Sequence, residues 1–164
     1  METLSVLKRR LTDTELNLIL AKTIEERSHI GSSLLYLADA GKVKESLRNF
    51  DYEGRLRVFY RESCHGSEII LVGLLAYDVG YSWWSKKRIL SEVFVFGLDP
   101  EFKGFGRVAI KELDSLAKLY NCDVIIAGNF FMEKPAVMTN TYKKGGFEIS
   151  CPTYTKVVGG LENG

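Results

Sequence analysis

The stretch SEVFVFGLDPEFKGFGR, residues 91–107, decides the fold. Its first half has the composition of a strand and ends at Pro100, and its second half is a loop with two glycines. Helical periodicity follows from Gly104 to Tyr120, and residues 123–127 then form a short apolar run typical of a buried parallel strand. A strand, a helix and a strand in this order predict a βαβ crossover, which is right-handed in nearly all proteins.

The segments on either side extend this crossover into a mixed sheet. Three strands joined by short connections predict an antiparallel meander, over residues 55–61, 68–78 and 88–98. The other expected elements are an edge strand, three helices and a last strand, at residues 4–8, 13–27, 43–50, 135–144 and 147–151. We therefore expect a mixed α+β or α/β fold, an antiparallel meander followed by a parallel βαβ crossover, with helices on both faces of the sheet.

The composition indicates one soluble domain of ordinary size. The chain has 164 residues, of which 46% are hydrophobic and 12% aromatic, so it is long and apolar enough to fold around a core. The 22 Lys and Arg residues against 21 Asp and Glu residues leave a net charge of +1, which excludes recruitment of nucleic acid or a membrane by overall charge. We expect residues 1–158 to form a single domain and residues 159–164 to form a flexible tail.

Cysteine usage and the first residues indicate a reducing compartment. Cys64, Cys122 and Cys151 are far apart and form no CxxC pair, so neither a disulfide framework nor a metal site is expected. The N-terminus lacks a basic segment followed by an apolar stretch, and the longest apolar run, residues 69–77, is about half of the ~20 residues that a membrane span needs. We expect a location in the cytoplasm, or in a particle assembled there.

The helix that begins near Gly104 is a candidate anion site. The first amides of a helix have no partner within the helix and carry partial positive charge, so they attract phosphate groups. Gly104 and Gly106 remove side chains that would keep a phosphate away, and Lys103 and Arg107 flank the loop with positive charge. A glycine-rich turn without a ligand would have the same local sequence, so both interpretations stay open at this point.

Two motifs in this order and at this separation resemble one family. LDPEFKGFG, residues 98–106, resembles the acyl-CoA pyrophosphate loop of the GNAT superfamily of N-acetyltransferases, which is written Q/R-x-x-G-x-G/A. YKKGGF, residues 142–147, is similar to the Y-x-K-x-G-F ending of the last long helix in that family. The order of the expected elements fits the same fold over about residues 4–158. Glu101 stands where the family usually has Gln or Arg, and in an alternative register Val108 replaces Gly or Ala.

The resemblance implies acetyl-CoA as the acyl donor, an amine of unknown identity as the acceptor, and direct transfer of the acetyl group between them. It also implies that the backbone of the strand before the loop contacts the pantetheine, and Gly97 is the predicted site of a bulge that separates this strand from the next. No metal is expected. The residues assigned to the cofactor by resemblance are Phe96, Leu98, Lys103, Gly104, Phe105, Gly106, Arg107, Val108 and Asn129.

Two side chains are candidates for the proton transfers of such a reaction. A free alkyl amine has a pKa of about 10, so a base must take its proton near neutral pH, and this contributes about 10²–10⁴-fold in rate. The resemblance implies that Glu92 is this base and that Tyr142 donates a proton to the departing sulfur. A solvent-facing strand glutamate and a packed helix tyrosine are the structural alternatives.

The sequence also permits a protein without catalytic activity. A GNAT-like domain can serve as a structural or interaction module, for example in a viral particle. Glu101, Val108 and the aromatic loop Tyr81–Trp84, which precedes the basic residues 86–88, motivate this hypothesis. We expect the loop to contact the acceptor, a partner protein or a second copy of the chain, and favour these over nucleic acid because the net charge is near zero.

Overall fold

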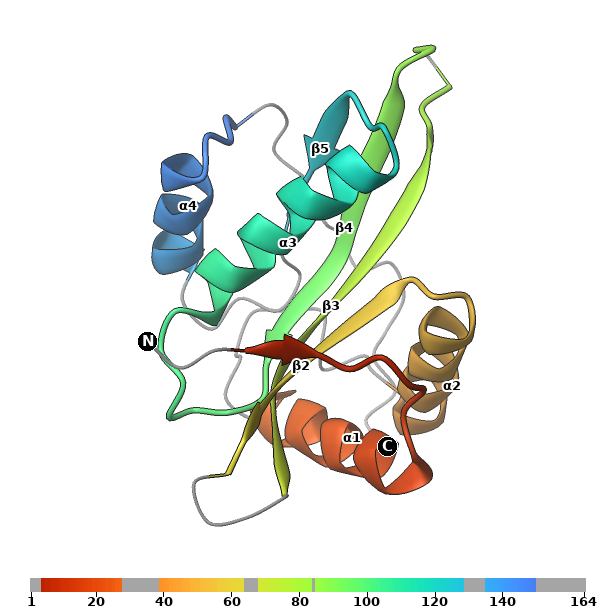
Figure 1. Cartoon of the computed structure of the whole chain (residues 1–164), viewed down its shortest axis with the longest axis vertical. Helices are drawn as coiled ribbons and strands as arrows, with labels where there is room; N and C mark the ends of the chain where they lie inside the picture. Colours follow the sequence, from red (N-terminus) through yellow and green to blue (C-terminus); the bar gives the residue numbers. More distant parts are fainter. Residues whose placement is uncertain (1–3, 28–38, 64–67, 84, 129–134, 150–164) are drawn as a thin grey trace, which may run out of the picture.

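A five-stranded sheet organises the part of the chain that the computed structural model describes, which is residues 4–27, 39–63, 68–83, 85–128 and 135–149. The strands lie in the order β1-β2-β3-β4-β5 (Figure 1). Their bounds are β1 Ser5–Val6, β2 Leu56–Glu62, β3 Ile69–Tyr81, β4 Arg88–Gly97 and β5 Val124–Ile126. The helices are α1 Asp13–Arg27, α2 Ala40–Tyr52, α3 Phe105–Leu119 and α4 Pro135–Lys144.

The sheet has the predicted topology. The strands β1 to β4 pair antiparallel in succession, and β5 pairs parallel with β4 after the crossover through α3. The helices α1 and α2 cover one face of the sheet, and α3 covers the other face with α4 beside it (Figure 1). The mixed fold expected from the sequence is therefore confirmed, including the meander, the parallel crossover and the helices on both faces.

Alternation along the central strands builds a hydrophobic core on each face. Leu74 and Phe96 belong to the core under α1 and α2, whereas Leu75 and Val95 belong to the core under α3. The strand β3 is buried over most of its length, because helices cover both of its faces. This explains why its sequence is a continuous apolar run rather than an alternating one.

The strand β4 carries one extra residue, Val93. Glu92 lies opposite Tyr77 and Phe94 lies opposite Ala76, so Val93 has no partner of its own in the β3–β4 ladder. Such a bulge bends a strand and increases its local twist, and bulges are frequent next to active sites. The strand β4 therefore changes direction directly after Glu92.

The sequence-based prediction of a bulge at Gly97 is wrong. Gly97 lies in register opposite Gly73, and the ring of Phe105 lies against these glycines. A Cβ atom on Gly73 would lie 2.4 Å from Cε1 and from Cζ of that ring. Because a glycine within a strand indicates either a bulge or a close approach of other atoms, the sequence could not distinguish the two, and here it is the close approach.

Local hydrogen bonds fix the helix ends. The helices α2, α3 and α4 end before residues with positive φ, which are Gly54 at 70°, Asn121 at 51° and Gly146 at 86°. After each of them, the next amide donates to the carbonyl five residues back, which is the Schellman motif. The capping box predicted for α1 is confirmed, since the Thr12 amide donates to Glu15 at 2.8 Å and the Glu15 amide donates to Thr12 Oγ1 at 3.2 Å.

The predicted last strand is not formed in the part of it that the structure describes. Residues 147–149 have no strand conformation, and the rest of the predicted strand, residues 150 and 151, lies outside the described residues. The predicted tail, residues 159–164, also lies outside them. Within the described residues, the sheet is therefore built by β1 to β5.

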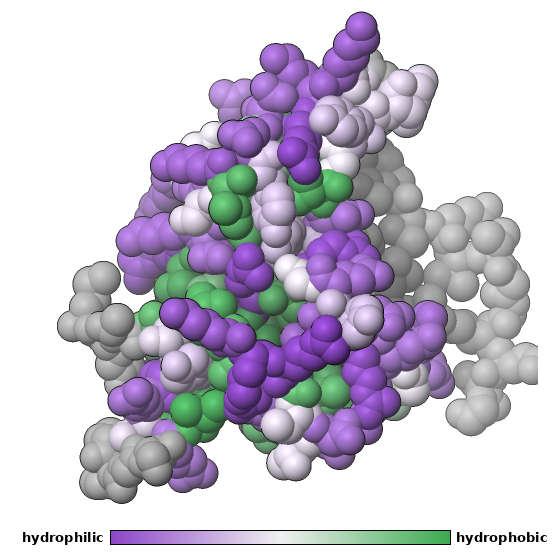
Figure 2. Space-filling view, turned by 45° about the vertical axis from the view of Figure 1, so that its right-hand side comes forward, coloured by the Kyte–Doolittle hydropathy of each residue, from purple (hydrophilic) through white to green (hydrophobic). Residues whose placement is uncertain are grey.

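Hydrophilic side chains predominate on the face seen in Figure 2, and the hydrophobic ones there form small separate patches. Large exposed apolar residues occur at the end of the β3–β4 hairpin, where Tyr81 is 68% and Trp83 is 93% exposed. No helix within the described ranges is long and apolar enough to cross a membrane.

Candidate active site

Glu92 and Tyr142 lie together where β4 leaves its parallel neighbour. The last pair in the β4–β5 ladder is Ser91 with Ile126, and Glu92 is the next residue of β4. Tyr142 comes from α4, 50 residues later, and its Oη donates to the Glu92 carboxylate, 2.6 Å from Oε2 and 2.8 Å from Oε1. The structure thus brings the two candidates for proton transfer into direct contact.

The C-terminal cap of α4 fixes the orientation of Tyr142. Its carbonyl accepts a hydrogen bond from the Phe147 amide at 3.0 Å, and the two rings pack edge to face with centroids 5.4 Å apart. A contact between these two positions accompanies many Schellman motifs, and Gly146 supplies the positive φ that the motif needs. The sequence YKKGGF is therefore a structural device that holds the phenol toward Glu92.

Two glycines let α4 approach α3 closely. A Cβ atom on Gly145 would lie 2.9 Å from Cγ2 of Ile110, and one on Gly106 would lie 3.3 Å from Sδ of Met138. The absent side chain of Gly106 thus makes room for α4, whereas the sequence pattern suggested room for a phosphate. Because Met138 lies one helical turn before Tyr142, this contact places the start of α3 near the Glu92–Tyr142 pair.

Burial determines the ionisation of the pair. Glu92 is 8% exposed, and this desolvation raises the pKa of its carboxyl above the usual 4.5, against a smaller opposing effect of the hydrogen bond from Tyr142. Desolvation is also the largest cause that raises the pKa of the Tyr142 phenol, followed by the charge of Glu92. Tyr142 therefore keeps its proton at neutral pH, and Glu92 binds a proton more readily than an exposed carboxylate does.

The start of α3 differs from the starts of α1 and α2, which have side-chain caps. Its N-cap is Gly104 in the left-handed conformation, with φ 89° and ψ 21°, and no side chain of a described residue caps it. The Arg107 amide donates to the Gly104 carbonyl at 3.0 Å, and the amides of Phe105 and Gly106 are left for water or a ligand. Arg107 folds back over this end, since a Cβ atom on Gly104 would lie 2.8 Å from its Nη2. Uncapped amides beside a guanidinium suit an anion.

The acidic residues before this loop are paired with Arg61 of β2. Its Nη2 lies 3.0 Å from Asp99 Oδ2, where both side chains are largely buried, and 3.5 Å from Oε2 of the exposed Glu101. The charge of Glu101, which departs from the family motif, is thus compensated within the protein. Lys103, predicted to add charge for a phosphate, donates from Nζ to the Pro100 carbonyl at 2.8 Å and so also shapes the turn.

Several residues assigned to the cofactor have side chains that belong to the core. The Phe105 ring is buried against Phe59, with centroids 5.4 Å apart, so only its backbone is at the helix start. Phe96 and Leu98 are buried in the core under α1 and α2, and the Leu98 amide donates to the Val72 carbonyl at 2.9 Å.

Two assigned residues remain. Val108 is half-buried and packs against the core under α3. Asn129 lies outside the described residues. Of the nine residues assigned by resemblance, Gly104 and Arg107 are therefore exposed at the uncapped helix start, where Phe105 and Gly106 contribute their backbone amides.

Sequence reasoning missed Arg61 and Gly73. Alternation placed Arg61 on a solvated strand face, and its partner Asp99 is 38 residues away, so no local spacing connects them. Gly73 interrupts the longest apolar run, and that interruption was the available signal of a close approach to Phe105.

The described residues offer no metal site. No group of three or more His, Cys, Asp and Glu within them could hold an ion. Cys122 is a free, half-buried thiol, and desolvation raises its pKa, which makes it a poor nucleophile. Cys64 and Cys151 lie outside the described residues.

Solved structures share this fold, although no family model and no curated protein matches the sequence. A possible acetyltransferase from Clostridium difficile 630 is similar with a TM-score of 0.65 at 14% identity, over 96% of this chain and 99% of that one. A predicted acetyltransferase with acetyl-CoA from Clostridium acetobutylicum gives 0.60 at 13% identity, over 94% and 96%. Glucosamine-6-phosphate N-acetyltransferase from Arabidopsis thaliana gives 0.58 at 14% identity, over 95% and 99%. The chain has the fold of the GNAT acetyltransferases, as its two motifs predicted.

Proposed function

We propose that this protein is an acetyl-CoA-dependent N-acetyltransferase that transfers an acetyl group directly to an amine. The observation that carries the proposal is the hydrogen-bonded pair of Glu92 and Tyr142 at the point where β4 and β5 part. The uncapped start of α3, which contacts α4 one turn before Tyr142, supports it. The fold supports it too, since one similar structure is described with acetyl-CoA.

The start of α3 fits the diphosphate of coenzyme A. It combines amides without a side-chain cap, the left-handed Gly104 and the guanidinium of Arg107. We assign the phosphates to the amides of Phe105 and Gly106 and to Arg107, and the pantetheine to the edge of β4 after Ser91. When bound, acetyl-CoA supplies an acetyl group activated as a thioester.

The hydrogen-bonded pair of Glu92 and Tyr142 suits a reaction in which the amine nitrogen loses one proton and the thioester sulfur gains one. The amine loses a proton as its nitrogen forms the amide bond, and the sulfur gains one as the carbon–sulfur bond breaks. We assign the first transfer to a Glu92 carboxylate oxygen and the second to Tyr142 Oη. The 2.6 Å hydrogen bond then lets Glu92 return its proton to Tyr142, which restores both groups for the next turnover.

Binding of acetyl-CoA is the first test. A ligand that binds only the folded state at 100 times its Kd stabilises that state by about 2.7 kcal/mol. For a chain of this length, that raises Tm by about 5–10 °C. Arg107→Ala should reduce the shift, and Lys111→Ala, an exposed cation on the same helix, is the matched control. No shift at millimolar acetyl-CoA would contradict the proposal.

Steady-state kinetics with a panel of amines test the two proton-transfer roles. Tyr142→Phe and Glu92→Gln should each lower kcat by about 10²-fold or more while the thermal shift with acetyl-CoA remains. Glu92→Gln should also remove the acidic limb of the pH–rate profile, because that limb reports protonation of the base. Tyr52→Phe replaces an exposed tyrosine outside the candidate site and should leave kcat unchanged. Loss of acetyl-CoA binding in both site variants would show that their roles are misassigned.

A second candidate function is a non-catalytic module that docks a partner through the β3–β4 hairpin. The observation in its favour is the exposed aromatic end of the hairpin, with Trp83 at 93% and Tyr81 at 68% exposure. Tryptophan and tyrosine are enriched at protein interfaces. A stable complex or self-assembly that Trp83→Ala abolishes, together with no thermal shift by acetyl-CoA, would favour the module.

A further inference from the structure

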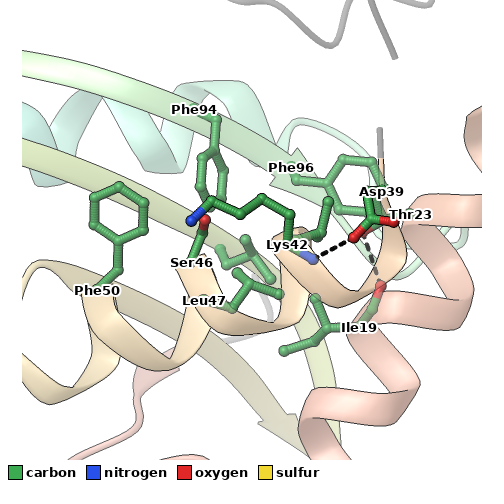
Figure 3. Close-up of a pocket in the computed structure, with 11 residues that line it drawn as sticks. Ile19, Thr23, Asp39, Lys42, Ser46, Leu47, Phe50, Phe94 and Phe96 are labelled. Atoms are coloured by element: carbon green, nitrogen blue, oxygen red, sulfur yellow. Dashed lines mark hydrogen bonds between the residues drawn. The ribbon is translucent and has the colours of Figure 1, made fainter. Parts of the chain in front are cut away.

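A cavity of about 360 Å³ lies between α1, α2 and the sheet. Three phenylalanine rings line it, from Phe50 of α2 and from Phe94 and Phe96 of β4 (Figure 3). Phe50 and Phe94 meet edge to face, with their centroids 6.0 Å apart. Aliphatic side chains of α1, α2 and β3 complete the wall, so the interior of the cavity is apolar and aromatic.

Most polar groups at the cavity are already engaged within the protein. Thr23 Oγ1 donates to the Ile19 carbonyl at 2.9 Å, and Asp39 Oδ1 accepts from the Lys42 amide at 2.7 Å (Figure 3). The Lys42 ammonium donates to Glu45 at 2.9 Å. An occupant with many polar groups would lose its hydration here without replacement, whereas an apolar body gains by leaving water. The cavity therefore selects for an apolar occupant.

The cavity lies against β4 on the opposite face of the sheet from the Glu92–Tyr142 pair. Glu92 lies opposite Tyr77, which belongs to the core under α3, whereas Phe94 lies opposite Ala76, which belongs to the core under α1 and α2. Phe94 lies two residues after Glu92 and directly after the extra residue Val93. The pairing of β4 with β5 has ended by then, at Ser91. A molecule held against the Phe94 ring therefore approaches the pair around the edge of β4 beyond Ser91, which is the edge assigned to the pantetheine above.

We infer that this cavity binds the aromatic body of the acceptor and that the acceptor is a primary arylalkylamine. The inference rests on the proposed transferase function and names its substrate class. Benzene fills a cavity of about 150 Å³, so the present volume has room for one ring with a short alkyl tether, or for a bicyclic ring system. Aromatic rings prefer edge-to-face and offset contacts, which Phe50 and Phe94 offer. The tether extends the amine from the cavity to the edge of β4.

Calorimetric titration with 2-phenylethylamine tests the cavity without any turnover. Ser46 of α2 lines the cavity, so Ser46→Phe should fill it and weaken binding at least tenfold. Asn49→Phe places the same side chain on an exposed position of the same helix and should leave the affinity unchanged. Ethylamine keeps the amine and lacks the ring, so it should bind the wild-type protein at least tenfold more weakly.

A second variant, Phe50→Leu, removes one ring with a small change of volume and should weaken binding several-fold even if Ser46→Phe folds poorly. Equal affinity in the wild type and both cavity variants, equal affinity for ethylamine, or no binding of 2-phenylethylamine would each overturn the inference. The thermal shift with acetyl-CoA on the same proteins separates the two proposals. If the shift persists while the amine result is negative, only the cavity assignment fails. If ring-dependent binding is lost in the variants but acetyl-CoA never shifts Tm, the transferase function fails and the cavity remains a binding site.

Discussion

Replacing Gly73 with alanine should disturb the start of α3 from within the sheet. A Cβ atom on Gly73 would lie 2.4 Å from Cε1 and Cζ of Phe105 and 2.8 Å from Cδ1. Carbon atoms in contact keep about 3.5–4.0 Å, so the ring would have to retreat by about 1 Å. It cannot retreat freely, because it is 7% exposed and already packs against Phe59 with ring centroids 5.4 Å apart.

Overpacking of this kind costs about 1–3 kcal/mol, and we expect about 2 kcal/mol for Gly73→Ala. In a chain of this length, that lowers Tm by about 4–8 °C. Gly80→Ala lies on the same strand with no atom within 4 Å of the new Cβ, so it should change stability by less than about 0.5 kcal/mol. Because Phe105 is the first residue of α3, Gly73→Ala should also reduce the thermal shift by acetyl-CoA.

Thermal or urea unfolding of the wild type, Gly73→Ala, Phe105→Leu and the double variant forms the decisive cycle. Leucine is shorter than phenylalanine, so Phe105→Leu should relieve the clash. The double variant should then be about 1–2 kcal/mol more stable than the sum of the single effects indicates. If Gly73→Ala is as stable as Gly80→Ala, the close approach of Gly73 and Phe105 is refuted. It is also refuted if the stability changes of Gly73→Ala and Phe105→Leu simply add in the double variant.

Three further substitutions test separate parts of the site. In the folded protein, the pKa of Glu92 lies above the 4.5 of an unperturbed carboxyl. The wild type should therefore lose stability as pH rises from about 4.5 through that folded pKa. Urea unfolding midpoints measured between pH 4 and 9 should show this loss in the wild type and not in Glu92→Gln. Gly146→Ala should cost about 1–2 kcal/mol in thermal unfolding, because a φ of 86° is strained for a residue with a Cβ, and Gly80→Ala again serves as control. Arg61→Met should cost about 2 kcal/mol in the same assay, because it leaves the largely buried Asp99 without its cation, and should weaken the response to acetyl-CoA.

Local sequence signals predicted most of the fold. The helix expected at residues 13–27 coincides with α1, and the helix expected from Gly104 to Tyr120 is α3, Phe105–Leu119. Both helices could be predicted because apolar spacing and capping residues act within a few residues of each other. The strand β3 continues to Tyr81, three residues beyond the predicted end at Asp78. Those residues are held by pairing with the start of β4, from Arg88 onward, and such long-range pairing has no signature in local hydrophobicity.

The candidate site could be predicted only through the resemblance. Glu92 and Tyr142 are 50 residues apart, and no spacing rule joins a strand residue to a residue on the second helix after it. The pairing of Arg61 with Asp99 depends in the same way on the register between strands. The wrong prediction at Gly97 has a related origin. A glycine within a strand indicates either a bulge or a close approach of other atoms, and only the packing of the neighbouring elements shows which of the two occurs.

The motifs that carry the resemblance are packing devices, so they do not by themselves distinguish an enzyme from a non-catalytic module. Gly104 and Gly146 provide positive φ, and Gly106 lets α4 pack on α3. A non-catalytic domain with this fold would need all three glycines as well. Glu92 differs, because burying its carboxyl opposes folding at neutral pH, and no described ion pair compensates for that burial. A neutral residue at this position would serve the sheet better, so keeping an acid there is costly to stability and points to chemistry. If Glu92→Gln is more stable than the wild type above pH 7 and loses turnover, the stability cost of the buried acid is connected to catalysis. If Glu92→Gln is more stable but the wild type has no measurable turnover, the buried acid has no catalytic reason.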